Sequence, residues 1–434
     1  MVFRHFPHYV LFFLIFFSFA GVSAKEKDSL RTAAEAGNTA AQFRLANEYF
    51  YGSRTRKKNY TLAAHWYLTV ANKNVPEGMF NYALCLDQGL GVERNPFLAA
   101  EYYRKAAETK TLPYAMFNYA LLLRKGIVCR SREEEKRRPQ NFNFEKDEAK
   151  SNLLLEELIQ RGFAPAMTEM AEILFHKKER SPEETDRIFT LLYRASKDSA
   201  APAKTFRYLS DCYFNGIGTR PDGVRMIECL ERAVHKGDAM SMLKLAYCLE
   251  SGVYVDLNEK RALELYQRAA KYGHGEALFK VGKAIAENRI KNISPVQAME
   301  YYKRAAEKNH AEAWYRLGEI LEQGNEKVKA DIVSARNAYF QSARLGYPRA
   351  QYRVGLFFLG EEEQTAVKDF TAAVYWFRQG AERGDGPSMR GLAHCLYHGK
   401  GCDADRSLGM YWLKRAAQEG DLRAMEMIRN RQIP

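Results

Sequence analysis

The sequence predicts an all-α protein assembled from stacked helix pairs, and three observations lead to this fold class. The chain has 434 residues, about three times the roughly 150 residues of a typical single domain. Hydrophobic residues make up 46% and charged residues 27%, with only 13 prolines, a composition typical of an ordered and well-packed protein. A unit of 36 to 38 residues recurs along most of the chain, and a period of this length indicates a solenoid.

The repeated unit is clearest at His310–Gly346. Four other units share its frame closely: Asp238–Gly273, His274–Asn309, Tyr347–Gly384 and Asp385–Gly420. Five earlier units follow it with decreasing fidelity: Asn38–Lys73, Asn74–Thr111, Leu112–Gly162, Phe163–Ser199 and Ala200–Gly237. The sequence therefore predicts about ten repeats across residues 37–420, numbered 1 to 10 in chain order.

Each repeat has the pattern of two helices. In repeat 8, Trp314, Leu317, Gly318 and Leu321 follow the i, i+3, i+4 spacing of a helix, and Gly324 suits the residue that ends it. The second helix carries paired aromatic and paired small residues, as in Tyr301, Tyr302, Ala305 and Ala306 of repeat 7. Glycine and alanine at fixed positions let antiparallel helices approach closely, while the neighbouring aromatic rings fill the remaining space.

The resulting pattern is Ala-x-x-x-Leu-Gly-x-x-Leu-x-x-Gly followed by Ala-x-x-Tyr-Tyr-x-x-Ala-Ala, with Gly-x-Gly turns at Gly89-Leu-Gly91 and Gly216-Ile-Gly218. It resembles the Sel-one-like repeat, a relative of the tetratricopeptide repeat, over residues 37–420. Repeats 3 and 4 depart most, since repeat 4 lacks the Gly-x-Gly turn. The resemblance implies a right-handed α-solenoid whose first helices line a concave groove, and a role as an adaptor or scaffold for other proteins.

The regions outside the regular repeats also have interpretable patterns. Residues 25–36 resemble the end of a second helix and residues 421–434 the start of a first helix, so we expect both to cap exposed faces. Repeat 3 is longer than the others because it contains a charge-dense insertion at residues 130–144. We expect this insertion to be a solvated loop, with a docking loop as the alternative.

The N-terminal segment predicts export. Met1–Tyr9 carries Arg4 and no acid, Val10–Ala20 is almost continuously apolar, and small residues precede a cleavage site after Ala24. Residues 1–24 are therefore predicted to be a signal peptide, and the apolar run is too short for a spanning anchor. We expect a periplasmic or secreted protein, with the endoplasmic reticulum lumen as the alternative in a eukaryote, and no transmembrane segment after cleavage.

The cysteines are better explained by packing than by chemistry. Four of the seven fall at one repeat position, four residues before the glycine that ends a first helix, where a small buried hydrophobe fits: Cys85, Cys212, Cys248 and Cys395. If a disulfide forms in this exported chain, Cys229 with Cys248 is the favoured pair, because the two flank the turn at Gly237 symmetrically. Cys212 is the competing partner for Cys229.

The sequence does not indicate an enzyme, a cofactor or a metal site. Ser241 and Lys244 match the Ser-x-x-Lys pattern of serine β-lactamases, but the Ser-Asp-Asn and Lys-Thr-Gly partner motifs are missing. Ser241 also occupies an ordinary repeat position. No Cys-x-x-Cys pair occurs, so none of the cysteine spacings resembles a zinc site.

A row of basic residues is the candidate binding feature. Lys244, Lys280, Arg316 and Arg353 immediately precede the Leu-Gly pair, or its counterpart, in repeats 6 to 9. The resemblance places this position on the groove side, where four bases in register would attract carboxylates. The alternative is that salt bridges to acidic residues neutralise the row; the candidates are Glu276, Glu312 and Glu319.

The same repeat position carries amides in repeats 2 and 3. Asn81 and Asn118 occupy it, and paired amides can hold an extended peptide backbone.

Three classes of function follow from these features. The favoured one is an exported scaffold that binds a protein or peptide, possibly an acidic one, through the groove. The second is a binder of anionic envelope polymer, consistent with the formal net charge of +13, and the third is a β-lactamase-like enzyme. Nucleic acid is not an expected partner, because no recognition motif occurs. The sequence leaves the oligomeric state and the partner's identity open.

Overall fold

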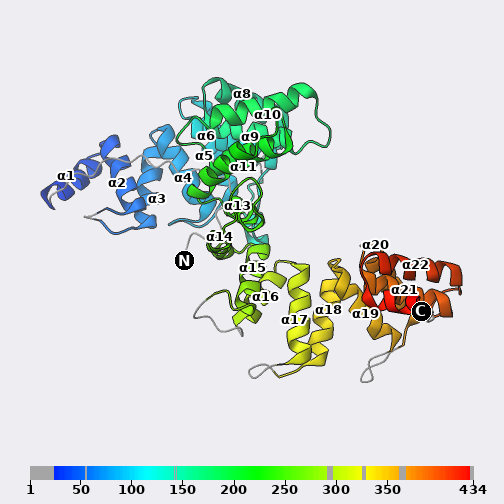
Figure 1. Cartoon of the computed structure of the whole chain (residues 1–434). Helices are drawn as coiled ribbons and strands as arrows, with labels where there is room; N and C mark the ends of the chain where they lie inside the picture. Colours follow the sequence, from blue (N-terminus) through cyan, green and yellow to red (C-terminus); the bar gives the residue numbers. More distant parts are fainter. Residues whose placement is uncertain are drawn as a thin grey trace. The chain divides into compact units, whose positions relative to one another are not determined.

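The computed structural model describes residues 24–53, 56–140, 142, 144–290, 297–324, 329–360 and 368–430. Within these residues it contains 23 helices and no strand, which confirms the predicted all-α repeat fold (Figure 1). None of the helices so described combines the length and the hydrophobicity needed to cross a membrane. The predicted signal peptide lies outside the described residues, apart from Ala24.

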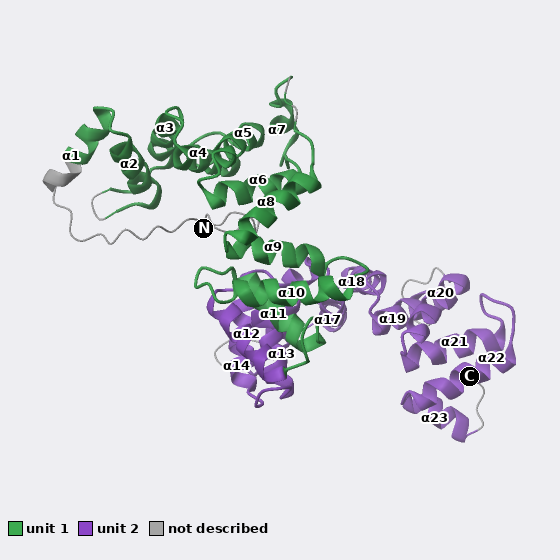
Figure 2. Cartoon of the chain, turned by 90° about the horizontal axis from the view of Figure 1, so that it is seen from above, with its two compact units in different colours: residues 1–222 green, residues 223–434 purple. Residues whose placement is uncertain are grey.

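The chain divides into two compact units, Met1–Asp222 and Gly223–Pro434 (Figure 2). The helices of the first unit are α1 (Ala24–Glu35), α2 (Thr39–Tyr51), α3 (Tyr60–Ala71), α4 (Pro76–Gln88), α5 (Pro96–Glu108), α6 (Pro113–Lys125), α7 (Arg132–Lys136), α8 (Glu148–Gln160), α9 (Ala164–Phe175), α10 (Pro182–Ala195) and α11 (Ala203–Asn215). Those of the second unit are α12 (Gly223–His235), α13 (Ala239–Ser251), α14 (Glu259–Lys271), α15 (Gly275–Ala286), α16 (Gln297–Ala306), α17 (Ala311–Gln323), α18 (Ile332–Arg344), α19 (Pro348–Leu359), α20 (Phe370–Glu382), α21 (Gly386–His398), α22 (Arg406–Gln418) and α23 (Leu422–Arg429).

Helix caps set the repeat boundaries. An Asn or Asp side chain accepts a hydrogen bond from the backbone N–H three residues on at many helix starts, as Asp238 does for α13 and Asn258 for α14. Many first helices end at a glycine with positive φ, for example Gly89 (φ +73°) and Gly252 (φ +70°). The helix ends are therefore specified locally, and stacking of the pairs follows from their apolar faces.

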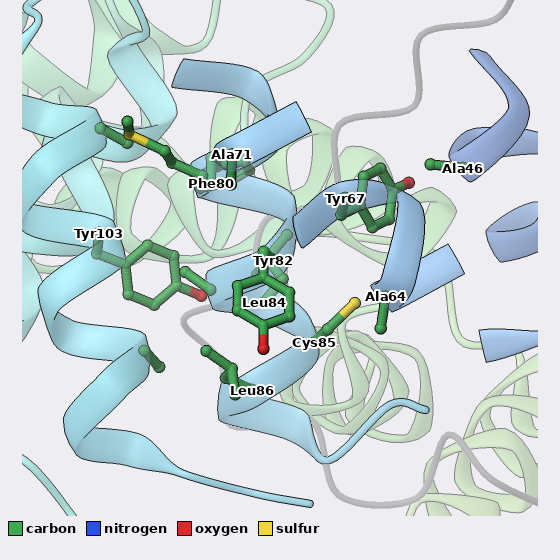
Figure 3. Close-up of a cluster of buried hydrophobic side chains, with 14 of the residues drawn as sticks. Ala46, Ala64, Tyr67, Ala71, Phe80, Tyr82, Leu84, Cys85, Leu86 and Tyr103 are labelled. Carbon is green, nitrogen blue, oxygen red and sulfur yellow. The ribbon is translucent and has the colours of Figure 1, made fainter. Parts of the chain in front are cut away.

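Within both units, a first helix packs against the second helix of its own repeat, and that second helix packs against the next first helix. The interior is built from aromatic rings facing small residues. Figure 3 shows part of this core in the first unit, where Tyr67, Tyr82 and Tyr103 lie among side chains that include Ala64 and Cys85.

Glycine makes the close helix approach possible. A Cβ atom added at Gly318 would lie 2.7 Å from a ring carbon of Tyr339, and one at Gly355 would lie 2.4 Å from the ring of Phe377. Both distances are far inside van der Waals contact. This confirms the inference that the small residue of the Leu-Gly pair makes room for an aromatic ring of the second helix.

The insertion of repeat 3 packs on repeat 2. It contains the short helix α7, whose Glu134 is 9% exposed and forms an ion pair with Arg94 in the turn after α4. Arg137 donates a 3.0 Å hydrogen bond to the backbone oxygen of Arg94. Although the sequence favoured a solvated loop, this part of the insertion is held by buried charge against the preceding repeat.

The second glycine of the Gly-x-Gly turn provides a test of the stacking. Gly91 has φ +73°, and a Cβ atom there would lie 2.1 Å from the backbone carbonyl of Tyr60, at the start of α3. Gly91→Ala should therefore lower the free energy of unfolding through both backbone strain, about 1–2 kcal/mol, and displacement of α3, about 1–3 kcal/mol more.

The matched control is Gly162→Ala, because Gly162 has φ +78° and open space around its Cβ position. For Gly162→Ala, the free energy of unfolding should fall only by the contribution from backbone strain. Urea denaturation followed by circular dichroism measures both variants, and equal losses of stability would show that the turn does not brace α3.

Candidate functional site: the first-helix face of repeats 6 to 9

The four basic residues predicted to form a row occupy equivalent positions. Lys244, Lys280, Arg316 and Arg353 are each the sixth residue of a first helix, in α13, α15, α17 and α19 of the second unit. The side chains of Lys280, Arg316 and Arg353 are 20%, 31% and 25% exposed. They are therefore accessible at their tips and packed along their stems.

Lys280 lies in a polar and aromatic environment built by repeat 6. Its ammonium group is 2.8 Å from Glu250 Oε2, and the hydroxyl of Tyr266 donates a 2.8 Å hydrogen bond to the same oxygen. The ammonium also lies 5.0 Å from the ring centroid of Tyr247 and 5.7 Å from that of Tyr266. Glu250, at the end of α13, thus binds both the second helix of its own repeat and the first helix of the next.

The same arrangement recurs two repeats later. Arg353 forms an ion pair with Glu322, at the end of α17, and the hydroxyl of Tyr339 donates a 2.8 Å hydrogen bond to that carboxylate. The guanidinium lies 5.2 Å from the ring centroid of Tyr339. We call each set a carboxylate–tyrosine–base triad: Glu250, Tyr266 and Lys280 form one, and Glu322, Tyr339 and Arg353 the other.

Arg316 is neutralised differently, because Ala286 occupies the position where Glu250 and Glu322 stand in their repeats. Arg316 instead bonds to Glu312 at 3.1 Å and to Glu319 at 2.9 Å, both on its own helix. Glu276, the other carboxylate expected to pair with the row, accepts hydrogen bonds from Tyr247 and from His310 Nε2, the latter at 2.8 Å.

On this face the charges of Lys280, Arg316 and Arg353 are paired with carboxylates, so the face is not a row of unpaired cations. For Lys280, Arg316 and Arg353 the structure supports the salt-bridge alternative, with Glu250 and Glu322 as partners that the sequence analysis did not identify. Superposing the repeat frames would have found them, because both are the twelfth residue of a first helix followed by a tyrosine-bearing second helix.

The amides of the first unit do not present an equivalent face. Asn118 is only 6% exposed, next to the fully buried Tyr103. Asn81 is half-buried, and its amide nitrogen donates a 2.9 Å hydrogen bond to the backbone oxygen of Glu77. A partner that lies on the first-helix face there meets Asn81 but not Asn118.

A cleft lies beside the insertion of repeat 3. It has a volume of about 800 Å³ between α5, α6 and the start of α8, and it is lined by Phe142 and Phe144 and by the cations Arg104, Lys146 and Lys150. Four carboxylates also line it, so its charge is mixed: Glu101, Glu145, Asp147 and Glu148.

Ser241 is in a capping environment rather than a reactive one. Its side chain is fully buried, and its hydroxyl donates a 2.7 Å hydrogen bond to the N-cap residue Asp238. Ser388 makes the same contact with Asp385 at the equivalent place in repeat 10. The geometry assigns these serines to the start of a first helix.

The cysteines are separate thiols in this structure. Burial raises the pKa of the Cys229 thiol to about 11, so it is a poor nucleophile at neutral pH. The Cys229–Cys248 bridge stays a prediction for an oxidising compartment. Among the described residues no group of three or more His, Cys, Asp or Glu side chains is arranged to hold a metal ion. The sequence analysis nevertheless overlooked one spacing, His394-x-x-x-His398.

The triad of Glu250 makes stability depend on pH. Burial alone would raise the pKa of Glu250, but the hydrogen bonds from Lys280 and Tyr266 outweigh it and hold the pKa below the usual value of 4.5. A carboxyl with a depressed pKa in the folded state stabilises the protein above the pKa of the unfolded chain, and this stabilisation is lost as the pH falls through the folded value. We therefore expect the Tm to fall steeply as the pH is lowered below about 4.5.

Glu250→Gln removes the ionisable group from the triad. This variant should have a lower Tm than the wild type at pH 7 and a shallower fall below about pH 4.5. Glu264→Gln, on the exposed side of α14, is the control and should keep the wild-type profile. Thermal melts from pH 3 to 7 decide this prediction, and parallel profiles for Glu250→Gln and the wild type would contradict it.

Comparisons with known proteins agree with this repeat architecture. The Sel1 repeat model matches residues 39–75, 76–108, 207–238, 239–274, 275–310, 311–347, 348–385 and 386–421. Repeats 3 and 4, which depart most from the pattern, are the ones left unmatched.

Curated relatives match short stretches. The chitin synthase regulator SKT5 of Saccharomyces cerevisiae is 30% identical over 112 residues, which cover 26% of this chain and 16% of that protein. Protein sel-1 homolog 2 of Mus musculus is 32% identical over 76 residues, covering 18% of this chain and 11% of that protein. The chain thus spans only a small part of the length of these relatives.

A solved structure matches nearly the whole chain. The protein is c5321, a protective antigen of uropathogenic Escherichia coli strains with an SLR fold, and it superposes with a TM-score of 0.66 at 23% identity, over 93% of this chain and 81% of that chain. At this identity the likeness establishes the fold. With eight matched repeats over more than half of its length, the chain belongs to the Sel1 repeat family.

Proposed function

We propose that this protein is a scaffold that binds a polypeptide partner through the first-helix face of repeats 6 to 9. The observation that carries the proposal is the triad, which holds a part-exposed base and a part-exposed carboxylate at equivalent places two repeats apart. Side chains that are ordered before binding lose little conformational entropy on binding. A ladder of such groups suits a partner whose charges are spaced along an extended segment or a helix.

The proposed partner carries an acidic stretch. Lys280, Arg316 and Arg353 are each held by an internal carboxylate, so a carboxylate of the partner adds to or replaces an existing ion pair there instead of meeting an unpaired cation. Such contacts at a part-exposed site contribute about 0.2–1 kcal/mol each. Affinity therefore grows by accumulation along the face, and no single residue dominates it.

We also propose that the protein acts after export, in the periplasm or outside the cell. Residues 1–24 support this, because they combine a basic start, an apolar run and a small-residue cleavage site. The names of two relatives are consistent with a binding role: one is a regulator of chitin synthase and the other a protective antigen, and both descriptions concern those proteins.

Charge-swapped triads test the binding face. Reversing Lys280 alone would leave Glu250 facing a second carboxylate and would destabilise the fold. The double variant Glu250→Lys/Lys280→Glu keeps the ion pair but interchanges the positions of the acid and the base. Glu322→Arg/Arg353→Glu makes the same exchange in the second triad. Fluorescence anisotropy measures the binding of labelled poly-glutamate, with poly-glutamine of the same length as the neutral probe.

Each swap should weaken poly-glutamate binding about two- to fivefold, and the loss should shrink as salt is raised. Arg31→Glu/Glu35→Arg is the matched control, an exposed pair on α1 in the first unit. Unchanged affinity in both swapped variants would contradict the proposal. If the swapped variants still bind poly-glutamate but Arg104→Glu/Lys150→Glu does not, binding takes place in the cleft beside the insertion. Tighter binding of polygalacturonate than of poly-glutamate would favour an anionic polymer as the ligand.

A further inference from the structure

The last turn of α21 brings two histidines together. His394 and His398 lie one helical turn apart in the segment His-Cys-Leu-Tyr-His, immediately before Gly399 ends the helix. Their ring centroids are 4.8 Å apart, with an interplanar angle of 54°. His394 is half-buried and His398 is exposed, so both rings can be reached from solvent.

A neighbouring lysine identifies the reactive nitrogen of one ring. The ammonium nitrogen of Lys400, in the turn after α21, lies 2.9 Å from His394 Nε2. An ammonium group can only donate hydrogen bonds, so Nε2 of His394 must be the acceptor and must carry a lone pair. This nitrogen already directs its lone pair towards a cation outside the helix.

We propose that His394 and His398 bind a divalent late transition metal ion, Cu²⁺, Ni²⁺ or Zn²⁺, with water completing its coordination. Imidazole nitrogen is a preferred ligand of these ions, and two histidines at i and i+4 on one helix face are the arrangement found in helical zinc sites.

The ring separation fits this role. With metal–nitrogen bonds of about 2.0–2.1 Å, two imidazoles on one ion place their centroids roughly 4.5 Å apart at a right angle and roughly 5.2 Å apart at the tetrahedral angle. The separation of 4.8 Å falls between these limits. The observed spacing of the two rings is thus compatible with both of them binding one ion.

The nearby thiols do not enlarge the site. Cys395 is completely buried among the core residues of repeat 10. The thiol of Cys402 is directed to the backbone oxygen of Lys400 at 3.9 Å. Two protein ligands make the site weaker and more exchangeable than a structural zinc site with four, and by affinity order Cu²⁺ should bind most tightly of the three.

Lys400 acts against the metal in two ways, since it occupies the Nε2 lone pair of His394 and places a positive charge beside the ion. Replacing Lys400 with methionine keeps a similar stem and removes both effects. Metal binding by the wild type must therefore displace Lys400 from His394, and the variant should bind more tightly than the wild type.

The test is a titration of the untagged full chain with CuCl₂, NiCl₂ and ZnCl₂ by isothermal calorimetry. We expect one ion per chain and a rise in Tm with added metal. His394→Ala and His398→Ala should each weaken binding on the order of tenfold or more, because the chelate is lost. Lys400→Met should strengthen it, and His65→Ala, at an exposed histidine of α3, should leave it unchanged.

Electron paramagnetic resonance of the Cu²⁺ complex provides a second measurement. Hyperfine structure from two nitrogen ligands in the wild type, reduced to one in either single variant, would support the assignment. Undiminished affinity in the His394→Ala/His398→Ala double variant, whose helical circular dichroism serves as the folding check, would overturn it. Weaker binding by Lys400→Met would also overturn it.

Discussion

The close contact between a glycine of the first helix and an aromatic ring of the second determines much of this structure. At Gly318 the missing Cβ atom lets the Tyr339 ring lie against the helix backbone. A ring seated there carries its hydroxyl past the helix to Glu322, one turn further along α17, where Arg353 of the next repeat also arrives. Packing between two helices thus fixes the position of a polar group that joins two repeats.

Only some repeats carry a complete triad. Repeat 7 keeps a tyrosine, Tyr302, and is followed by a base, Arg316, but Ala286 stands in the carboxylate position. In repeat 9 the ring is Phe377, which packs on Gly355 and Gly391 but has no hydroxyl. The carboxylate position there is Leu359 and the base position of the next repeat is Gly391, so all three polar groups are replaced by apolar or small ones. A half-buried carboxylate without its tyrosine and its base would be destabilising. In repeats 6 and 8, where the carboxylate is present, both of its partners are present too.

These dependencies explain which features the sequence could predict. Helix pairs follow from spacing within about 15 residues, and the pairing of Arg316 with Glu312 and Glu319 follows from neighbours three and four residues apart on one helix. Glu250 meets Lys280 across 30 residues, so their contact depends on how one repeat stacks on the next. The burial of Asn118 and the anchoring of the insertion by Arg94 and Glu134 depend on tertiary packing in the same way. His394 and His398, four residues apart, were visible in the sequence and were overlooked.

A binding face made of internal ion pairs has a physical consequence for recognition. A bare row of cations would attract any polyanion, whereas paired charges present alternating sign at the repeat spacing and repel a partner whose charges are out of register. The ordering of these side chains has already occurred during folding, so a matching partner gains contacts without immobilising them again. Under the proposed binding role, selectivity would depend on which residue of each pair is the acid and which the base, and so on the sequence of repeats 6 to 9, while the stack itself is common to every repeat. A change of partner would then require substitution of only a few exposed side-chain tips and would leave the glycine–aromatic contacts beneath them intact.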